Sequence, residues 1–324
     1  MATYKGIQGY TVQKLSSDPT VEEAVGQLWY NSSTGKFKVA TQSAGTWAAG
    51  GTMNNARYEL AGCGLQTAGL VFGGSTPVKN ETEKYDGTSW TEVANLNLAR
   101  SQLAGAGTNT AGLAFGGNVP PAASGWKDET ETWDGTSWAE VADLNQGRSA
   151  LAGAGITTAA LAMGGNYPNT AYVGLVETWD GTSWTEVADL NTDRAYAQAA
   201  TQGTPTASLV FGGHTGSASD YTETYDGTSW AETADLNTAR SRGGGAGTQT
   251  AAVCFGGDPG PTGVTETWDG SSWTETTDMT TARGDIAGFG TSNLALAAAG
   301  RPPTTGATEE WTDPVYAIKT VTVS

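Results

Sequence analysis

One stretch of ten residues constrains this chain most, because the sequence returns to it at nearly regular intervals. From Glu129 to Trp138 it reads Glu-Thr-Glu-Thr-Trp-Asp-Gly-Thr-Ser-Trp. Runs of β-branched and aromatic residues joined at Asp-Gly favour a β-hairpin, since a tight turn needs positive φ. The repeated unit is therefore a hairpin. Its other copies are Glu83–Trp90, Glu177–Trp184, Glu223–Trp230, Glu266–Trp273 and a degenerate copy that is cut off after Trp311.

A Trp and an Arg ten residues apart set the period. The six pairs are Trp47 and Arg57, Trp90 and Arg100, Trp138 and Arg148, Trp184 and Arg194, Trp230 and Arg240, and Trp273 and Arg283. A Gly that ends a Gly-Gly pair, or Ala299-Gly300 in the last repeat, follows the Arg after 17 residues, except that Gly213 follows after 19. From that Gly to the next aromatic residue the spacing varies between 11 and 16 residues. Variation in length is thus concentrated in one connection of the repeat.

Each repeat divides into four short predicted strands. In the second repeat they are Gln102–Gly107, Ala111–Phe115, Thr130–Asp134 and Ser137–Val141. Four strands at this period predict an all-β fold, a six-bladed β-propeller with four-stranded blades. The first repeat starts with only a fourth-strand piece, and the last lacks one. We therefore expect the strand around Trp47 to complete the last blade, which removes a free sheet edge.

Three segments follow from this pattern. Residues 1–44 form a small N-terminal β module, with a predicted strand at Gly6–Lys14, a turn with a short helical segment at Ser16–Val25, and a hairpin from Gln27–Asn31 and Lys36–Val39. Residues 45–312 form the propeller. Residues 313–324 form a C-terminal tail whose Val315–Val323 alternates like a strand and is expected to pair with the N-terminal hairpin.

Charge and cysteine content restrict the partners. The chain has 33 acidic against 16 basic residues, a net charge of −17. Such a surface repels phosphate backbones and anionic lipids, so we expect no nucleic-acid partner and no membrane insertion. Cys63 and Cys254 are expected to be small buried residues rather than a disulfide or metal pair. The N-terminus lacks a signal-peptide core, which predicts a soluble protein without a classical export signal.

The Gly-Gly pair, a spaced Tyr or Trp and a second Trp resemble the kelch repeat of kelch and galactose-oxidase-like propellers over residues 45–311. The chain departs from that pattern in its Asp-Gly between the aromatics and in its nearly identical, Thr/Ala/Gly-rich copies. This style, together with Leu15-Ser-Ser-Asp-Pro19 and Gly26-Gln-Leu-Trp-Tyr-Asn31, resembles structural proteins of tailed bacteriophages. The resemblance implies a virion protein that is assembled in the host cytoplasm.

Residues present in every repeat are interpreted as framework rather than as a site. This covers the six Arg, the six Trp and the Asp of the Asp-Gly turns. An arginine cluster for carboxylates and a cation site at the turn Asp are the functional alternatives. The single His214 does not provide the copper site that resemblance to galactose oxidase would imply, and no phosphate loop or Ser-His-Asp order is present. We expect no cofactor, no metal and no enzyme, although a pair of catalytic carboxylates stays an alternative.

The variable connections hold the candidate recognition residues. They follow the second strand of each blade, so they are expected on one face of the propeller. Aromatic residues beside Asn and Asp are suited to holding sugars; packing against neighbouring subunits is the alternative. The candidates are Trp126, Asp128, Tyr167, Asn169, Tyr172, His214, Asp220, Tyr221 and Asp258.

These interpretations favour a non-enzymatic bacteriophage virion protein, tail-associated or capsid-decorating. Residues 1–44 and the C-terminal strand would contact other virion proteins, and the propeller would bind host-surface glycan or neighbouring proteins. A cellular kelch-type adaptor or lectin is the second hypothesis, and a glycan-cleaving propeller enzyme is the third. The sequence leaves open whether the chain forms a homo-oligomer.

Overall fold

The computed structural model describes residues 12–20, 24, 26–119, 125–167, 170–313 and 316–322. In this part of the chain every regular element is a strand, so the prediction of an all-β fold is confirmed. The strands form seven four-stranded sheets. The chain divides into two compact units, residues 1–45 with 313–324, called here the small unit, and Thr46–Thr312, called the propeller unit.

The number of four-stranded sheets is seven, so the prediction of six was wrong. The extra sheet lies in the small unit, where a hairpin was expected. It contains β1 (Gln13–Leu15), β2 (Leu28–Asn31), β3 (Lys36–Gln42) and β28 (Tyr316–Thr320), in this order. β1 runs parallel to β2, and the other pairs are antiparallel. The C-terminal tail was expected to pair with the hairpin, and β28 does so along β3. The parallel pairing of β1 with β2 was not predicted, because no local turn connects the two strands.

The small unit contains the predicted hairpin, whereas part of the segment before it lies outside the described residues. Most of the predicted strand Gly6–Lys14 lies outside the described residues, and β1 begins at Gln13. The hairpin is present as β2 and β3. Its buried Trp29 donates from Nε1 to Asp18 at 3.0 Å, and Asn31 Nδ2 also donates to Asp18. These hydrogen bonds lower the pKa of Asp18, Asn31 contributing most.

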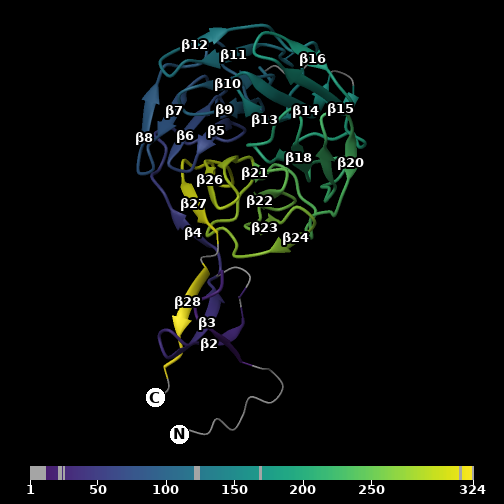
Figure 1. Cartoon of the computed structure of the whole chain (residues 1–324). Helices are drawn as coiled ribbons and strands as arrows, with labels where there is room; N and C mark the ends of the chain where they lie inside the picture. Colours follow the sequence, from purple (N-terminus) through teal and green to yellow (C-terminus); the bar gives the residue numbers. More distant parts are fainter. Residues whose placement is uncertain are drawn as a thin grey trace. The chain divides into compact units, whose positions relative to one another are not determined.

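The other six sheets lie in the propeller unit, around a common axis (Figure 1). The first strands, which line the axis, are β5 (Ala61–Leu65), β9 (Ala104–Gly107), β13 (Ala152–Ile156), β17 (Gln198–Ala199), β21 (Gly244–Thr248) and β25 (Ala287–Gly290). The second strands are β6 (Ala68–Phe72), β10 (Gly112–Phe115), β14 (Ala159–Tyr167), β18 (Ser208–Phe211), β22 (Ala251–Phe255) and β26 (Leu294–Ala298).

The third and fourth strands complete each sheet toward the outer rim, and all neighbouring strands in the six sheets are antiparallel. The third strands are β7 (Thr82–Tyr85), β11 (Thr130–Trp133), β15 (Thr170–Trp179), β19 (Thr222–Tyr225), β23 (Thr265–Trp268) and β27 (Thr308–Thr312). The fourth strands are β8 (Trp90–Val93), β12 (Trp138–Glu140), β16 (Trp184–Glu186), β20 (Trp230–Glu232), β24 (Trp273–Glu275) and β4 (Thr46–Ala49).

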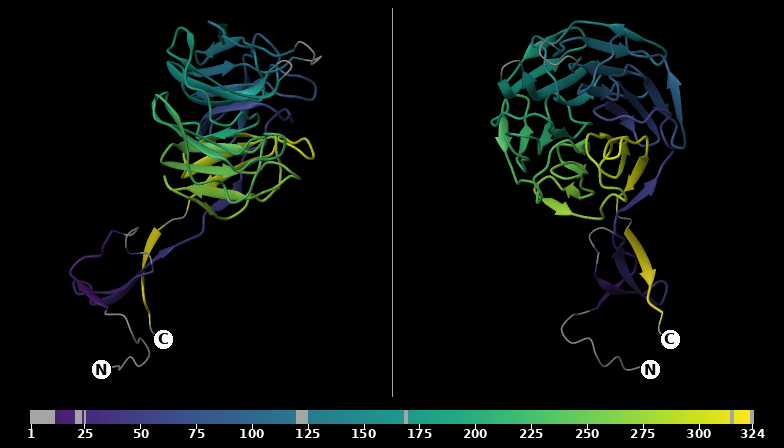
Figure 2. Two further views of the ribbon diagram at one scale, coloured as in Figure 1. Left: turned by 90° about the vertical axis from the view of Figure 1, so that its right-hand side faces the viewer. Right: turned by 180° about the vertical axis from the view of Figure 1, so that it is seen from behind.

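One sheet joins the two ends of the propeller unit. β4 pairs with β27, and Trp311 lies opposite Trp47. In the second sheet, Trp133 lies opposite Trp138 in the same way. Figure 2 shows these two ends of the propeller unit side by side in the ring. The strand near the beginning of the repeats therefore occupies the fourth-strand place that the last repeat lacks.

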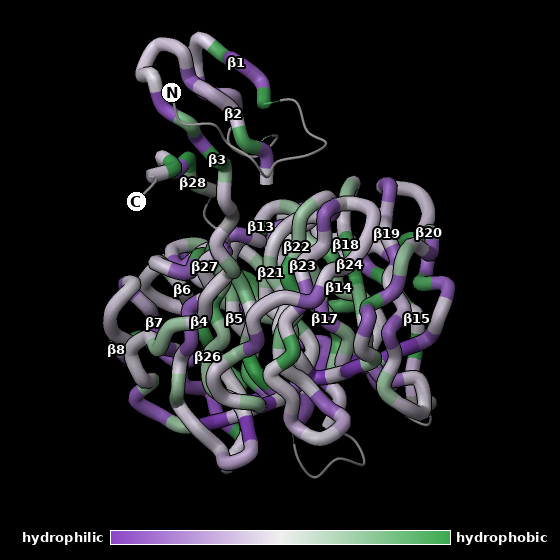
Figure 3. The backbone as a smooth tube through the Cα atoms, turned by 90° about the horizontal axis from the view of Figure 1, so that it is seen from below, coloured by the Kyte–Doolittle hydropathy of each residue, from purple (hydrophilic) through white to green (hydrophobic). Residues whose placement is uncertain are grey.

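Small residues on the axial strands permit close approach of neighbouring sheets. A Cβ on Gly105 would lie 2.7 Å from the ring of Phe72 in the preceding sheet, and one on Gly62 would lie 2.7 Å from Phe289. Since real side chains do not approach so closely, glycine is required at both positions. Figure 3 shows hydrophobic segments within the packed strands and hydrophilic ones in many of the connecting loops.

The repeated Asp-Gly-Thr-Ser segment forms the turn between the third and fourth strands. In the second sheet, Gly135 has φ +97°, a value that glycine adopts at little cost. Asp134 Oδ1 accepts hydrogen bonds from the Thr136 hydroxyl at 2.7 Å and from the amides of Thr136 and Ser137 at 2.8 Å. These bonds lower the pKa of Asp134 from 3.8 to about 2. The carboxylate is therefore engaged in holding the turn.

Candidate functional site

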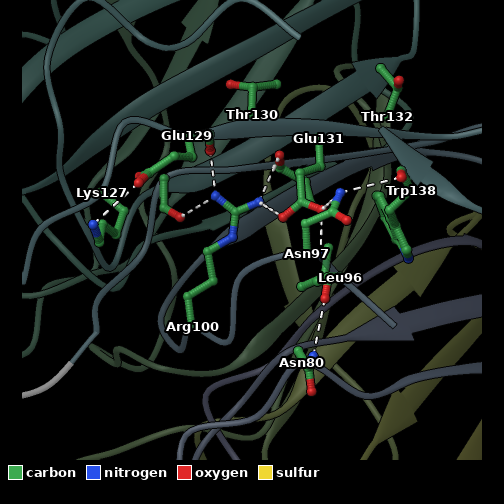
Figure 4. A network of polar contacts seen from close by, with 12 residues as sticks. Asn80, Leu96, Asn97, Arg100, Lys127, Glu129, Thr130, Glu131, Thr132 and Trp138 are labelled. Atoms are coloured by element: carbon green, nitrogen blue, oxygen red, sulfur yellow. Dashed lines mark hydrogen bonds and ion pairs between the residues drawn. The ribbon is translucent and has the colours of Figure 1, made fainter. Parts of the chain in front are cut away.

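The repeated arginines lie in buried networks within the sheets. Arg100 Nη2 donates to Glu131 Oε1 at 3.0 Å, and both side chains are almost fully buried (Figure 4). Glu131 Oε2 accepts from the amide and the side chain of Asn97, at 2.7 and 2.9 Å. Burial lowers the pKa of the Arg100 guanidinium, and the charge of Glu131 opposes that shift. The carboxylate thus ties the connection between β8 and β9 to the third strand β11.

The same ion pair occurs in each sheet of the propeller unit. All twelve side chains are at most 5% exposed, so the six guanidinium groups do not meet in an open pocket. Their neighbours are carboxylates of the same sheet. The pairs are Arg57–Glu83, Arg100–Glu131, Arg148–Glu177, Arg194–Glu223, Arg240–Glu266 and Arg283–Glu309.

Two residues after each of these arginines, the backbone enters the left-handed region. The φ angles lie between 52° and 61°, although none of the six residues is glycine. An L-residue with a side chain is strained in this conformation, by about 1–2 kcal/mol. We call these six residues the mouth ring: Glu59, Gln102, Ala150, Tyr196, Arg242 and Asp285.

Backbone hydrogen bonds join the mouth ring into a continuous circle. Each amide donates to the carbonyl of the ring residue in the preceding sheet, and the amide of Glu59 completes the circle by donating to Asp285 at 3.0 Å. The circle explains why the left-handed conformation persists, because six hydrogen bonds depend on it. The other five bonds are Gln102 to Glu59, Ala150 to Gln102, Tyr196 to Ala150, Arg242 to Tyr196 and Asp285 to Arg242, at 2.7–3.0 Å.

The mouth ring lines a cavity of about 100 Å³, together with residues that begin the axial strands, such as Leu103 and Leu151. Further along the axis lies a cavity of the same volume, between strands that include Gly105 and Gly153. Pockets that enclose a small molecule usually have volumes of 300–1,000 Å³. The axis therefore admits only a protruding part of a ligand.

At the opposite end of the axial strands, Gln202 connects three sheets. Its amide donates to the carbonyl of Gly247 at 2.8 Å, and its Nε2 donates to that of Gly64 at 3.4 Å. Beside it, the carbonyl of Thr201 accepts from Gly155 at 3.2 Å. This segment accounts for the longer spacing before Gly213, since it follows the short strand β17 and adds length to the fourth repeat.

A chain of charged and aromatic side chains covers one half of the mouth. The Arg242 guanidinium lies 4.0 Å above the Tyr196 ring, and that of Arg301 lies 4.3 Å above Tyr58. Both arginines approach Asp285, with Arg301 Nε at 2.6 Å from Oδ2 and Arg242 Nη1 at 3.5 Å from Oδ1. We call these five residues the polar ladder. The arginine side chains are 26% and 38% exposed, whereas Asp285 is buried.

The other half of the mouth contains one charge among neutral groups. Glu59 accepts from Gln102 Nε2 and from Ser75 Oγ, both at 2.8 Å. Ala150 follows Gln102 in the ring and has only a methyl group. The mouth thus presents the polar ladder on one side and amide, hydroxyl and methyl groups on the other.

The variable connections begin next to the mouth ring. The residue after each Gly pair, or after Ala299-Gly300, forms a β-bridge with the residue that precedes a ring residue. The residue type after the Gly pair also differs from sheet to sheet, except that Asn occurs twice, as Asn118 and Asn166. The bridges are Tyr58 to Ser75, Ser101 to Asn118, Ser149 to Asn166, Ala195 to His214, Ser241 to Asp258 and Gly284 to Arg301.

The structure brings some of the predicted recognition residues together. His214 and Asp258 occupy this bridging position, and the Tyr172 ring lies 5.3 Å from that of His214. Burial raises the pKa of Asp258, and the nearby charge of Asp285 raises it further. These residues border the mouth.

The remaining candidates are spread over the loops. Trp126 forms a β-bridge with Asn118 within its own loop. Asp128 is an exposed residue, but its carboxyl group is partly desolvated, which raises its pKa. Tyr167, Asp220 and Tyr221 are partly to mostly exposed, Tyr221 being 45% exposed. Asn169 lies outside the described residues.

Sequence reasoning missed the mouth ring, although a signal was present. Counting two residues from each repeated Arg reaches Glu, Gln, Ala, Tyr, Arg and Asp, six different residues in copies that otherwise nearly agree. Loop length, which marks the variable connections, is constant at this position. Divergence at a fixed spacing would have identified it.

In the described part of the chain, no group of three or more His, Cys, Asp or Glu side chains is arranged to hold a metal ion. The same residues contain no helix suited to crossing a membrane. Cys63 and Cys254 are buried, free thiols, and burial raises their pKa to about 12 and about 11.

Comparison with known proteins supports the fold alone. No protein-family model matches the chain, and no curated protein matches its sequence. The solved structure of YjhT superposes with a TM-score of 0.66 at 13% sequence identity, over 83% of this chain and 99% of that chain. Together with the four-stranded antiparallel sheets, this similarity fits a β-propeller.

Proposed function

We propose that this chain is a non-enzymatic recognition protein of a bacteriophage particle, in which the propeller unit binds its target at the mouth ring. One observation carries the proposal. The chain contains 46 glycines and uses glycine at other left-handed positions of the repeat, such as Gly117 and Gly135. At the mouth ring it has six different side chains instead, where glycine would be least strained. Side chains retained against strain support a binding role.

The proposal includes a closed ring of six kelch-like blades. Six sheets belong to the propeller unit, and β4 pairs with β27. The six hydrogen bonds between backbone amides and carbonyls of the mouth ring form a circle. The seventh sheet belongs to the small unit, which combines segments from both termini. In this proposal the small unit attaches the protein to other virion proteins. The bacteriophage assignment rests on the sequence resemblance of the repeats and of residues 15–31.

The size of the axial cavities favours binding over catalysis. An enzyme that cleaves a glycan surrounds the reacting bond with two carboxyl groups. A cavity of about 100 Å³ does not enclose such a bond, and the carboxylates of Glu59 and Asp285 are already engaged with Gln102, Ser75 and the ladder arginines. Recognition of an exposed group needs neither enclosure nor a free general base.

The test combines particle composition with adsorption. The chain should be present in purified particles, as measured by mass spectrometry, and a variant lacking residues 1–44 should be absent from them. Particles carrying Tyr196→Ala with Arg242→Ala should adsorb to host cells about tenfold less, because two neighbouring contacts are lost. Particles with Glu186→Gln, an exposed site on β16, serve as the control. Absence of the wild-type chain from particles, or undiminished adsorption of the double variant, would contradict the proposal.

A further inference from the structure

The charges at the mouth restrict what it binds. Arg242 and Arg301 supply two positive charges, while Glu59, Asp258 and Asp285 supply three negative charges. The arginines of the polar ladder are therefore neutralised locally, and the whole chain carries −17. A ligand with a carboxylate, sulfate or phosphate group would meet net repulsion here. A neutral ligand would not.

The functional groups at the mouth match a ligand that both donates and accepts hydrogen bonds. The exposed parts of the two guanidinium groups donate, and the carboxylate of Glu59 accepts from its neighbours and has further lone pairs. Gln102 adds an amide, and Tyr196 adds an aromatic ring over which the Arg242 guanidinium lies. Adjacent hydroxyl groups of a sugar satisfy such a mixed set, because each hydroxyl donates one hydrogen bond and accepts others.

The cavity volume indicates which part of a glycan enters. A volume of about 100 Å³ is well below the roughly 300–1,000 Å³ of pockets that enclose a whole small molecule. This volume accommodates the edge of one sugar ring with its hydroxyl groups and leaves the remainder of the chain outside. An internal residue of a glycan has neighbours on both sides, whereas the last residue presents a free edge.

From these observations, and building on the recognition role proposed above, we infer that the mouth ring binds the terminal, uncharged sugar residue of a glycan end-on. The polar ladder contacts its hydroxyl groups on one side, and Gln102 and Glu59 contact them on the other. The loops with Tyr172, His214 and Tyr221 border the rest of the glycan.

The experiment uses the full chain on an array of glycans that end in neutral sugars, and of the same glycans capped with a sialic acid or a sulfate group. The wild-type protein should bind neutral ends and lose about tenfold or more on capping. Asp258→Asn, next to the mouth ring but outside it, removes one of the three negative charges, so it should retain neutral binding and improve binding to capped glycans several-fold over the wild-type protein. Glu186→Gln removes one exposed charge on the fourth strand β16 and should change the binding of neither neutral nor capped glycans. Tyr196→Ala should lose neutral binding about tenfold.

Each other outcome has its own meaning. Stronger binding of capped than of neutral glycans would overturn the inferred ligand class and leave the recognition role intact. If no glycan binds while mouth variants still reduce adsorption, the target is not a glycan and the inference fails alone. Binding that survives Tyr196→Ala but is lost in Tyr221→Ala would move the site to the loops and overturn both proposals. Melting temperatures of all variants, measured by circular dichroism, distinguish lost contacts from lost folding.

Discussion

Two positions in the repeat lie two residues apart and behave in opposite ways. The first carries Arg in all six copies, and each Arg is buried against a Glu of its own sheet. The second carries six different residues, and each stands at the mouth of the axis. At the second position the backbone is nearly the same in every copy, with φ between 52° and 61°. The difference shows that repetition marks what each sheet needs, and divergence marks what the assembled ring presents.

The largest expected effect comes from removing one buried carboxylate. Glu131→Ala leaves the Arg100 guanidinium buried without its ion pair and frees the amide of Asn97, so the free energy of unfolding should fall by about 3–5 kcal/mol. Chemical denaturation followed by tryptophan fluorescence measures it. Glu140→Ala, at an exposed position opposite Glu131, should change stability by less than about 0.5 kcal/mol. Equal effects of the two variants would remove the distinction between framework and surface.

A smaller effect tests whether side chains at the mouth ring are retained against strain. Ala150 has φ +56°, so Ala150→Gly should raise the free energy of unfolding by about 0.5–1 kcal/mol. Ala152, two residues later in β13, is a buried strand residue, and Ala152→Gly should lower it by about 1 kcal/mol. Denaturation of the two variants side by side measures the opposite signs. A loss of stability in both would mean that the mouth ring carries no relievable strain.

The smallest effect concerns acid stability at the outer turns. The turn Asp residues have pKa values lowered from 3.8 to about 2 by hydrogen bonds from the following Thr or Ser residues. A lowered pKa in the folded state means that the stabilisation is present above pH 4 and is lost as the pH falls toward about 2. Denaturation midpoints from pH 5 to pH 2 should decline accordingly. The five residues are Asp86, Asp134, Asp180, Asp226 and Asp269.

A variant in which all five turn Asp residues are replaced by Asn provides the control for this prediction. Asn keeps an acceptor oxygen for the turn but has no group that titrates in this range. Its denaturation midpoint should therefore depend less on pH between 4 and 2. The same decline in both proteins would assign the acid sensitivity to other carboxyl groups.

Much of the fold could be predicted because each repeat contains the strand and turn signals for most of one sheet. The strand order within a sheet follows from the two short turns of each repeat: one joins the first and second strands, and the other is the Asp-Gly turn between Trp133 and Trp138. The small unit was harder to predict, since β28 joins β3 across nearly the whole chain and β1 adds in parallel. Neither pairing leaves a local turn signal. The alternation of the tail still indicated a strand next to the hairpin, as β28 is, whereas the parallel addition of β1 was not anticipated.

The candidate site also contains residues that could be predicted from the sequence and residues that could not. His214, Tyr172 and Asp258 were predicted as recognition residues because their loops differ in length and content, and they border the mouth in the structure. The mouth ring was missed because its spacing is constant. Its residues are far apart in sequence, from Glu59 to Asp285, and become neighbours only when the sheets close around an axis.

The sequence by itself determined the repeated sheet, because the hairpin turn, the Trp pair and the Arg–Glu pair all act within one copy or between adjacent copies. The tertiary structure alone decided which residues share a surface. Asp285 receives Arg242 from the neighbouring sheet and Arg301 from its own, and Glu59 closes the circle from the other end of the repeats. Hydrogen bonding and packing within a sheet depend on residues of one repeat or of adjacent repeats. The polar ladder, in contrast, forms only when the sheets surround the axis.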